Sequence, residues 1–489
     1  MSAAEIEKKA EEDAGGTAGG ELLYCGGTNW ETMGRKATAA AGNLVLPTRL
    51  RSLVGVDIRV VASGCSSCHC VALDVEGRCY TWGRNEKGQL GHGDIRHRYL
   101  PAIIHGLSEY KIVGAAAGRN HTVVITDEGK GFSFGLNKHG QLGTGSAKNE
   151  IETYPVPCMV SHVTNVACGA DFSVWLSSEE GSSILTAGLP QYGQLGHGTD
   201  NEYNTKDSSV KLAYEAQPRP RAIAAFSDKT ITKVACGANH TVAVDSNGFV
   251  YTWGFGGYGR LGHREQKDEW VPRLVEVFQR HNVLPPDAVV AAGSVSSACT
   301  AGGGQLYMWG KLKTTGDEWM YPKPVMDLRS SANPKKVDVL DGMRVTSVAC
   351  GLGLSLIVVD RKNVGDRLDK LEIYDGGTAA ETEENNVSGV GNTSDKVNAN
   401  SSSKRKKQED SSEEYGDEGT EGDESEEEIN GESGSQRSQR GRKSATRGRG
   451  AKRTAPEAKS SGRGRGRPRS QEKDSSSRGR GRGRKQKSR

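Results

Sequence analysis

The stretch Val234–Gly254 (VACGANHTVAVDSNGFVYTWG) carries the pattern that decides the fold. A V-A-C-G phrase precedes H-T and an alternating apolar run, and an Asn-Gly turn leads into a second run that ends in W-G. Two such runs around an Asn-Gly turn predict a β-hairpin. A glycine-rich turn ending in L-G and a proline-containing strand follow, so each copy of the pattern supplies four short strands.

Copies of this pattern recur over about residues 20–360. The phrase is nearly identical at three sites and looser at three more, and successive copies are 51 to 68 residues apart. The copies end at Gly64, Gly118, Gly169, Gly237, Gly293 and Gly351. A period of this size with four strands is typical of a β-propeller, in which each period forms one blade. We therefore predict an all-β propeller.

The two ends of the repeat region are incomplete in complementary ways. A W-G-like phrase at Tyr24–Trp30 has no V-A-C-G before it, and the last copy, Val345–Val359, has no W-G after it. One blade built from both ends would leave no open sheet edge, which natural sheets avoid. Five whole blades and one composite blade predict six blades in this chain.

Charge divides the chain into a neutral region and a strongly polarised tail. The net charge is −2 over residues 1–360, −12 over 361–432 and +18 over 433–489, which gives the total of +4. Such polar, charged segments bury too little apolar surface to fold alone. We predict a disordered N-terminus at 1–20, a propeller at 21–360, a short helix at 361–375, and a disordered tail at 376–489. The tail is acidic at 408–432 and basic, rich in Arg and Gly, at 433–489.

The cysteines and the apolar runs place limits on the class of protein. Several of the ten cysteines fill a small-residue position of the repeat, where Ala117 and Ala292 also occur, so they predict reduced core residues of an intracellular protein. No apolar run approaches the length of a membrane span, and the acidic start is neither a signal nor a transit peptide. We expect no membrane span.

Two kinds of basic motif in the tail predict separate functions. A compact cluster is typical of a nuclear import signal, and the alternative is a solvated run of charge. The cluster consists of Lys404, Arg405, Lys406 and Lys407. Alternating Gly and Arg is suited to A·T-rich minor grooves of DNA and equally to RNA. The arginines concerned are Arg463, Arg465, Arg467, Arg469, Arg478, Arg480, Arg482 and Arg484.

Three catalytic or cofactor motifs occur by coincidence inside the repeats. Cys65–His69 spells the c-type haem attachment site, Gly131–Gly135 a nucleophile elbow, and Gly254–Gly259 a dinucleotide fingerprint. Alignment with the other copies makes each one an ordinary strand or turn of the repeat. We predict no cofactor, no metal and no bond-making active site. The histidines of the H-T phrase recur with the period, which predicts a local hydrogen bond within each blade.

The full pattern, V-A-C-G-x-x-H-T followed by W-G-x-N-x-x-G-Q-L-G-x-G, resembles the regulator-of-chromosome-condensation repeat family over about residues 20–360. Longer phrases such as WGRNEKGQLGHGD (Trp82–Asp94) and WGFGGYGRLGHREQKDEWVPRL (Trp253–Leu274) are most similar to its chromosome- and microtubule-associated branch, which binds Rac-type small GTPases. The resemblance implies chromatin, microtubules and a small GTPase as partners.

The resemblance also implies where a partner docks. In the founding member, one propeller face grips a small GTPase and stabilises its nucleotide-free state, and the loop after V-A-C-G lies on that face. The candidate contacts in this chain are Arg119, Asn120, His121, Asp171, Asn239 and His240. The long insertion Thr199–Gln217 is a further candidate, because extra length in a repeat forms a surface loop. The tryptophans of the ultraviolet-sensing branch are missing from these loops, so a photoreceptor is not expected.

The family norm is seven blades, whereas this chain yields six. Pro322–Leu328 (PKPVMDL) and Pro334–Leu340 (PKKVDVL) both look like outer strands, yet they begin only 12 residues apart. The strands that should separate them are missing. We infer from this spacing that one blade has been excised, through a splice variant, a genomic deletion or an erroneous gene model.

These observations favour a nuclear, chromatin-associated propeller that binds a small GTPase of the Ran, Rac or Arf type. It is a candidate guanine-nucleotide exchange factor, with a tail that binds DNA or RNA. The alternative is a non-catalytic scaffold in mitosis or chromatin organisation. The predicted location is the nucleus, at chromatin or the nucleolus, with the cytoplasm or the spindle as the mitotic location.

Overall fold

The structure is a computed structural model that describes residues 19–33, 43–204, 212–302, 305–311, 323–324, 337–362 and 364–376. The chain divides into two units, Met1–Asp395 and Lys396–Arg489, and all described residues belong to the first. Residues 1–18 of the N-terminal segment predicted over 1–20, and nearly all of the tail, therefore lie outside the described residues, and Gly20 belongs to strand β1.

The described residues form six four-stranded blades, as predicted: four blades are separate antiparallel sheets, and the other two belong to one nine-stranded sheet. Blade A contains β3 (Ile58–Ala62), β4 (His69–Asp74), β5 (Cys79–Gly83) and β6 (Arg98–Ile103). Blade B contains β7 (Ile112–Ala117), β8 (His121–Thr126), β9 (Gly131–Leu136) and β10 (Ile151–Pro157). Blade C contains β11 (Val163–Cys168), β12 (Phe172–Ser177), β13 (Ile184–Gly188) and β16 (Gln217–Ala222).

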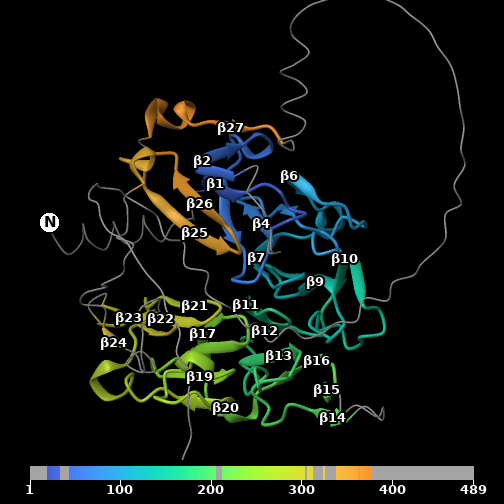
Figure 1. Cartoon of the computed structure of the whole chain (residues 1–489), viewed down its shortest axis with the longest axis vertical. Coiled ribbons are helices and arrows are strands. Elements are labelled where there is room, and N and C mark those ends of the chain that lie inside the picture. Colours follow the sequence, from blue (N-terminus) through green and yellow to red (C-terminus); the bar gives the residue numbers. More distant parts are fainter. Residues whose placement is uncertain are drawn as a thin grey trace, which may run out of the picture. The chain divides into compact units, whose positions relative to one another are not determined.

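Blade D contains β17 (Ile231–Cys236), β18 (His240–Asp245), β19 (Val250–Gly254) and β20 (Glu269–Leu274). Blade E contains β21 (Val290–Ala292), β22 (Ser296–Thr300), β23 (Leu306–Gly310) and β24 (Lys323–Pro324). Blade F contains β25 (Val345–Gly351), β26 (Leu354–Asp360), β1 (Gly20–Gly27) and β2 (Asn43–Leu50). The blades follow the chain around the molecule in Figure 1, from blue through green to yellow and orange.

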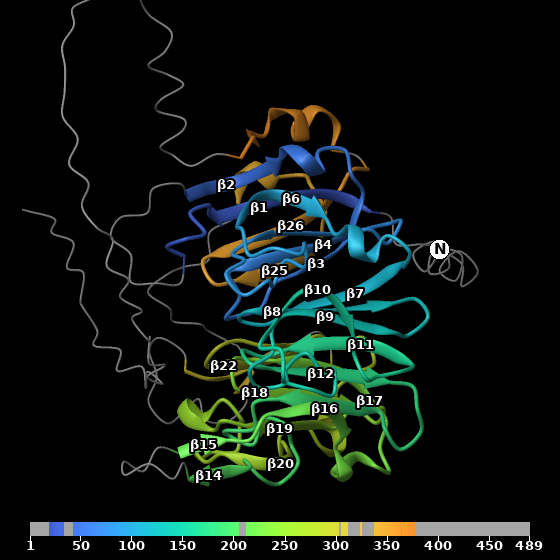
Figure 2. The same ribbon diagram turned by 90° about the vertical axis from the view of Figure 1, so that its right-hand side faces the viewer.

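Short elements connect and flank the blades. The described 3-10 helices are η1 (Arg51–Leu53), η2 (His105–Leu107), η3 (Ala224–Phe226), η4 (Gly257–Gly259), η5 (Arg280–Asn282), η8 (Asp338–Leu340) and η9 (Gly365–Lys370). Strand β27 (Ile373–Tyr374) pairs in parallel with β2. The insertion Thr199–Gln217 forms a hairpin of β14 (Glu202–Asn204) and β15 (Leu212–Tyr214), which lies at an extremity of the view in Figure 2.

The hairpin at the centre of each copy forms as its sequence predicts. In blade D, β18 and β19 pair in the register Val242–Thr252, and the turn between them contains Gly248 at φ +81°. Glycine adopts this left-handed conformation without steric cost, which explains the Asn-Gly pair there. All residues of β18 are buried, because both of its faces are covered by neighbouring blades.

The core of the propeller lies between blades. Phe172 and Val174 of blade C pack against Ala243 and Trp253 of blade D in one cluster, and equivalent clusters join the other packed neighbours. Trp82, Trp253 and Trp309, each of which belongs to a W-G phrase, are all fully buried. The tryptophan of W-G is therefore a packing residue of the blade interface. All ten cysteines are free thiols, as predicted.

The ends of the chain meet in blade F, which is the predicted composite blade. Strand β1 pairs with β26 along its whole length, with Leu23 opposite Ile357. The orange β26 accordingly lies beside the blue β1 in Figure 1, although some 330 residues separate them along the chain. One further pair, Gly20 with Ile58, joins blades F and A into a single sheet.

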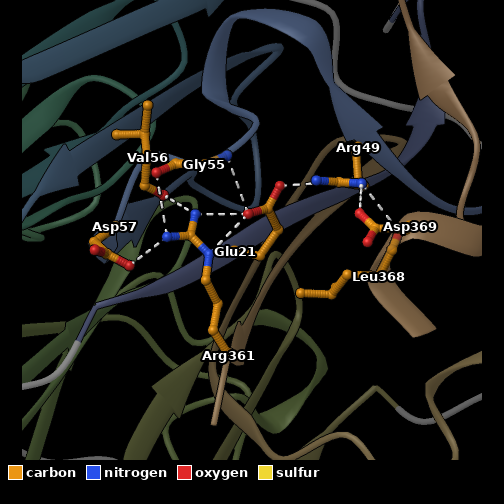
Figure 3. Close-up of polar contacts among 8 residues, drawn as sticks. All are labelled: Glu21, Arg49, Gly55, Val56, Asp57, Arg361, Leu368 and Asp369. Carbon is orange, nitrogen blue, oxygen red and sulfur yellow. Dashed lines mark hydrogen bonds and ion pairs between the residues drawn. The ribbon is translucent and has the colours of Figure 1, made fainter. Parts of the chain in front are cut away.

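A buried carboxylate reinforces this junction (Figure 3). The side chain of Glu21 on β1 is only 2% exposed, and its two oxygens accept hydrogen bonds from Arg49 Nε at 3.0 Å and Arg361 Nη2 at 2.6 Å. Arg49 also bonds the carbonyl of Leu368 and the carboxylate of Asp369. A buried charge is stable only when it is paired in this way. One network therefore connects β1, β2, the end of β26 and η9.

Within the range 361–375, where a short helix was predicted, the structure has the 3-10 helix η9 at Gly365–Lys370, whereas Ile373–Tyr374 form strand β27. Its flanking Val364 and its own Leu368 are buried against Leu23 and Val359 of blade F, and Leu371 packs beside them. The apolar spacing of these three residues therefore marks a real packing face.

Candidate partner-binding face

Two sets of loops lie at the same end of every blade. Because neighbouring strands are antiparallel, the loop after V-A-C-G, between strands one and two, and the loop after W-G, between strands three and four, emerge on the same side. We call this side the V-A-C-G face. It brings together the predicted contact loops and the glycine-rich turns.

Main-chain hydrogen bonds connect the V-A-C-G loops of successive blades. The amide of Arg119 donates to Ala170 O at 3.0 Å, and the amide of Ala170 donates to Ala238 O at 2.9 Å. On the other side of blade A, Leu352 N donates to Ser67 O at 2.9 Å. These bonds hold the centre of the face in one arrangement, which is what a preorganised binding surface requires.

Four of the six predicted contact residues lie at this face with different exposures. Arg119 has a half-exposed side chain and Nη1 lies 3.4 Å from Asp171 Oδ2, whereas Asp171 is 8% exposed. Asn120 accepts a hydrogen bond from Gln89 Nε2 at 3.3 Å, and Asn239 is partly buried. Arg119 is therefore the predicted residue with the most surface available to a partner.

The two predicted histidines, His121 and His240, lie beneath the face and are fully buried. His121 Nε2 lies 2.9 Å from Ser173 Oγ, and His240 Nε2 lies 2.9 Å from Ser297 Oγ. His69 makes the same contact with Thr122. His121 and His240 thus bond to the next blade, whereas the repeat pattern predicted bonds within a blade. His69 does both, because its Nδ1 also lies 2.9 Å from Ser67 Oγ in its own blade. A periodic sequence cannot distinguish the two arrangements.

The protonation of these histidines follows from their partners. Ser173 Oγ donates its proton to Gln141 O at 2.7 Å, so His121 donates to Ser173 from Nε2. Burial lowers the pKa of His121 to about 4, and burial together with the Arg260 charge lowers the pKa of His240 to about 3. Both are therefore neutral structural links at physiological pH.

A hollow of about 320 Å³ lies at the centre of the V-A-C-G face. Arg84, Lys87 and Arg119 line it together with one acidic residue, Glu86, whose carboxylate is 3.0 Å from Arg84 Nη2. Sequence analysis missed Arg84 and Lys87, because they belong to the turn after W-G. In an antiparallel four-stranded blade, the loops after strands one and three emerge at the same end. This rule could have placed Arg84 and Lys87 on the same face as Arg119.

An aromatic and cationic cluster occupies the equivalent turn of blade D. The guanidinium of Arg260 lies 4.5 Å from the ring centre of Phe255, and Lys311 Nζ lies 4.7 Å from that of Tyr258. Arg260 stands where blades A, B and C have glutamine, and burial lowers its pKa to about 10. Tyr258 is 45% exposed at φ +60°. Exposed aromatic rings of this kind are common anchors at protein interfaces.

The three coincidental motifs are structural parts of the blades, as predicted. His69 is a buried residue of β4, and Ser133 is a buried residue of β9 that donates to Leu142 O at 2.8 Å. Gly254–Gly259 leads into the short η4 turn. Within the described residues, no group of three or more His, Cys, Asp and Glu side chains could hold a metal ion. Nor is any described helix long and apolar enough to cross a membrane.

Comparison with known proteins places this architecture in a family. Residues 14–357 match the RCC1-like domain. The chain belongs to the RCC1-like domain family. This RCC1-like chain is 39% identical to human Protein RCC2 over 371 residues, covering 71% of the chain and 67% of that protein. It is also 39% identical to the Protein RCC2 homolog of Xenopus laevis, covering 72% and 69%.

A solved structure shares the fold of the RCC1-like chain. The crystal structure of human WBSCR16 aligns with a TM-score of 0.53 at 18% identity, covering 70% of this chain and 99% of that one. At this identity the likeness concerns the fold alone. The import cluster at 404–407 and the arginines between 463 and 484 lie outside the described residues, so their roles remain predictions.

Proposed function

We infer that the V-A-C-G face of this RCC1-like chain binds a small GTPase of the Ran, Rac or Arf type. The observation that carries the proposal is the convergence of Arg84, Lys87 and Arg119 on one hollow at the centre of a face held by main-chain hydrogen bonds. Charged groups around such a hollow favour an acidic partner surface and speed its association. Membership of the RCC1-like domain family supports the choice of a GTPase.

Such a face can promote nucleotide exchange without a bond-making residue. If it binds the nucleotide-free GTPase more tightly than the GDP-bound form, the difference in affinity lowers the affinity of the GTPase for GDP by the same factor. The required property is rigidity of the binding loops, and the loop-to-loop bonds of Arg119, Ala170 and Ala238 support it.

Release of labelled GDP from Ran-, Rac- and Arf-type GTPases tests this proposal. We expect the full chain to bind one of them and the double variant Lys87→Ala, Arg119→Ala to bind it at least tenfold more weakly, because charge-assisted contacts contribute roughly 1.5–3 kcal/mol each. The matched control is Lys111→Ala, Lys130→Ala, which removes two exposed lysines from the opposite end of blade B.

The outcomes separate the two functions. Binding with faster GDP release supports an exchange factor, and binding without faster release supports a GTPase-binding scaffold. An absence of binding to all three GTPases would contradict the assignment of the face and leave only the chromatin or mitotic scaffold. Equal losses in the two double variants would show that the effect is one of net charge.

The basic segment 433–489 is proposed to bind DNA or RNA at chromatin. Its net charge of +18 and its alternating Gly and Arg support an electrostatic mode of binding to phosphates. Deleting 433–489 should remove most nucleic-acid affinity together with its dependence on salt concentration. Retention of both by the shortened chain would contradict this proposal.

Nuclear location is proposed to depend on the cluster at residues 404–407. Replacing Lys404, Arg405, Lys406 and Lys407 by alanine should shift a fluorescent fusion of the full chain from the nucleus to the cytoplasm. An unchanged nuclear signal would contradict the assignment. Replacing Lys485 and Lys487 by alanine provides a control outside the cluster.

A further inference from the structure

The hollow at the centre of the V-A-C-G face is lined by loops from four blades. Blade A supplies Arg84 and Lys87 from the turn after β5, and blade B supplies Arg119 from the loop after β7. Ser294 of blade E and Leu352 of blade F belong to the same lining. Its volume of about 320 Å³ accommodates a small ligand or a single protruding group.

None of the three cations belongs to the repeat pattern. Arg84 occupies a position that is leucine in blades B and C and phenylalanine in blade D. Lys87 occupies one that is histidine in blade B and tyrosine in blades C and D. Arg119 occupies one that is alanine in blades C and D. The fold of a blade therefore requires no charge at these positions, and the meeting of three cations in one hollow indicates a binding site.

The positive charge of the hollow is only partly balanced. Glu86 is the one carboxylate of the lining, and its Oε2 lies 3.0 Å from Arg84 Nη2. Asp171 is not part of the lining, but its Oδ2 lies 3.4 Å from Arg119 Nη1 and reduces the excess. Lys87 is exposed and has no ion pair among the described residues. A net charge between one and two positive units is thus left for a ligand to neutralise.

Uncharged donors line the same hollow. Asn120 Oδ1 accepts a hydrogen bond from Gln89 Nε2 at 3.3 Å, so the amide nitrogen of Asn120 is a donor without an acceptor among the described residues. The hydroxyl of Ser66 has only the weak contact with Cys65 Sγ at 3.9 Å. Arg84 Nε is buried and bonds to none of the described residues. The hollow therefore has more donors than acceptors, which suits an oxyanion.

Several of these groups are held in place by their own chain. Arg84 Nη1 donates to Met33 O at 3.2 Å, and the main-chain amide of Arg84 donates to Cys68 O at 3.0 Å. The amide of Lys87 donates to Gln89 Oε1 at 2.9 Å. Donors that are fixed before binding lose less conformational entropy when a ligand arrives.

The chemistry of the lining favours a phosphate group over a carboxylate. A phosphate monoester carries about −1.5 to −2 charges near pH 7 and presents three strong acceptor oxygens. A carboxylate carries a single charge on two oxygens. Arginine binds phosphate through paired, charge-assisted hydrogen bonds, and clusters of arginine are a recurrent means of recognising it. Donors that come from two blades can contact several oxygens of one phosphate at the same time.

We propose that the hollow is a binding site for one dianionic phosphate group. Arg84, Lys87 and Arg119 neutralise its charge, and the side chains of Asn120 and Ser66 orient its oxygens. The ligand is a phosphate monoester, supplied either by a small molecule or by a phosphorylated side chain of a protein.

The site itself does not depend on the proposed binding of a GTPase. One consequence does rest on that function: a bound phosphate would neutralise the cations that we assign to the GTPase. Phosphate should therefore weaken the binding of the GTPase to the V-A-C-G face.

Labelling of Cys65 in the full chain tests the site, because this half-buried thiol lines the hollow. The reagent is an uncharged maleimide, and mass spectrometry gives the labelling rate of each cysteine. Saturating inorganic phosphate should slow Cys65 at least tenfold and leave Cys25, a half-buried thiol outside the lining, unchanged. Acetate and chloride at equal ionic strength should have little effect. Phosphate bound by the basic segment 433–489 does not enter this local measurement.

Matched variants identify the groups that bind. Arg84→Leu combined with Arg119→Ala introduces the residues that other blades hold at these positions, so the melting temperature should stay within a few degrees. This variant should lose the effect of phosphate on Cys65. Lys111→Ala combined with Lys130→Ala removes the same charge from the opposite end of blade B and should retain the effect.

Two further probes distinguish the sources of the phosphate. One is glycerol phosphate, and the other is a phosphoserine peptide with no other charged side chain. Protection of Cys65 at similar concentrations of both assigns the site to small phosphate monoesters. Protection by the peptide at a concentration at least tenfold lower assigns it to a phosphorylated protein, provided that the unphosphorylated peptide gives none.

Three outcomes would overturn the proposal. They are labelling of Cys65 that phosphate does not slow, equal slowing in the two double variants, and equal protection by phosphate and acetate. None of these measurements contains a GTPase. Their failure therefore leaves the proposed binding of a GTPase to its own test, and failure to bind a GTPase leaves the phosphate site unaffected.

Discussion

Blade F has two sides that differ sharply in how they are joined to the rest of the molecule. Towards blade A it is secured by the Gly20–Ile58 bridge and by the Glu21 network, in which Arg361 also pairs with Asp57 just before β3. Towards blade E, Val345 and Val348 of its innermost strand are exposed. The two ends of the chain therefore complete blade F by pairing β1 with β26, but this pairing does not by itself bury the side of blade F that faces blade E.

The difference has a physical cause in what each side offers. On the side of blade A, paired backbone groups, buried apolar residues and a paired buried charge all contribute together. On the side of blade E, the same repeat phrase is present but has no described partner surface. Much of the stability of a repeat protein comes from the interfaces between neighbouring repeats. The same repeat phrase therefore contributes more to folding stability on the side of blade A than on the side of blade E.

The largest expected effect comes from breaking the secured side. Glu21→Ala leaves the guanidinium of Arg49, which is 8% exposed, without its buried partner, and should destabilise the chain by about 3–5 kcal/mol. The midpoint of urea denaturation measures the change. Arg51→Ala removes an exposed ion pair with Asp375 from the same region and should leave the midpoint unchanged. Equal midpoints for the two variants would mean that the network contributes nothing to closure.

Acid should weaken the packed interfaces between blades. The pKa of His69 is lowered from 6.5 to about 3, mainly by burial, and His240 behaves alike. Each is neutral when folded and takes up a proton when unfolded, so its stability contribution is complete above pH 6.5 and is lost as the pH falls towards the folded pKa. Because the unfolded chain takes up a proton at each of these histidines, each one should lower the free energy of unfolding by roughly 2 kcal/mol as the pH falls from 6.5 to 5.

Denaturation midpoints at pH 7 and pH 5 measure this loss. His240→Asn should flatten the pH dependence, whereas replacing the exposed His162 by asparagine should leave it unchanged. A pH profile that is the same in both variants would show that the interblade histidines are not its source.

Matched truncations should distinguish the packed side from the open side. Val166→Ala removes two buried methyl groups and should cost about 1.5 kcal/mol. Val348→Ala removes the same groups from the exposed face of β25 and should change stability by less than about 0.5 kcal/mol. Thermal or urea denaturation is sufficient to compare them. A loss for Val348 as large as that for Val166 would show that this face of β25 is covered in solution.

The smallest expected effect concerns a hydroxyl that connects blades. Ser297 Oγ donates to Arg260 O at 2.9 Å in the preceding blade, so Ser297→Ala should cost roughly 1 kcal/mol. Ser355 occupies the same position in β26 of blade F, where its described neighbour is Cys350 Sγ at 3.8 Å in its own blade. Ser355→Ala should therefore be neutral. A double-mutant cycle with His240 would show whether the pair acts as a unit.

Much of the fold could be predicted because the same pattern of strands and turns recurs in every copy of the repeat. The hairpin register, the outer strands and the composite blade all follow from local patterns of turn residues and alternation. A helix near Gly365–Lys370 was also predictable from the spacing of Val364, Leu368 and Leu371, although its short 3-10 form and the strand at Ile373–Tyr374 were not. Short helices are set by packing and by their ends more than by sequence periodicity.

The candidate face was predictable only in part. Arg119 follows V-A-C-G directly, so the repeat pattern places it on the face. Arg84 and Lys87 come from a different turn, and their approach to Arg119 depends on how two blades pack. His121 and His240 were expected in the same loops, but burial between blades turns them into structural links.

The sequence by itself determined that the chain is a propeller of repeated four-stranded blades closed through its two ends, because hairpins, turns and strand alternation are local properties. Only the tertiary structure decided which copies of the V-A-C-G phrase are buried, where the cations converge, and which side of blade F is exposed. The physical reason is that burial and electrostatic environment belong to contacts between blades, and identical phrases such as Val166–Gly169 and Val348–Gly351 acquire different roles when one has a neighbour and the other lacks one.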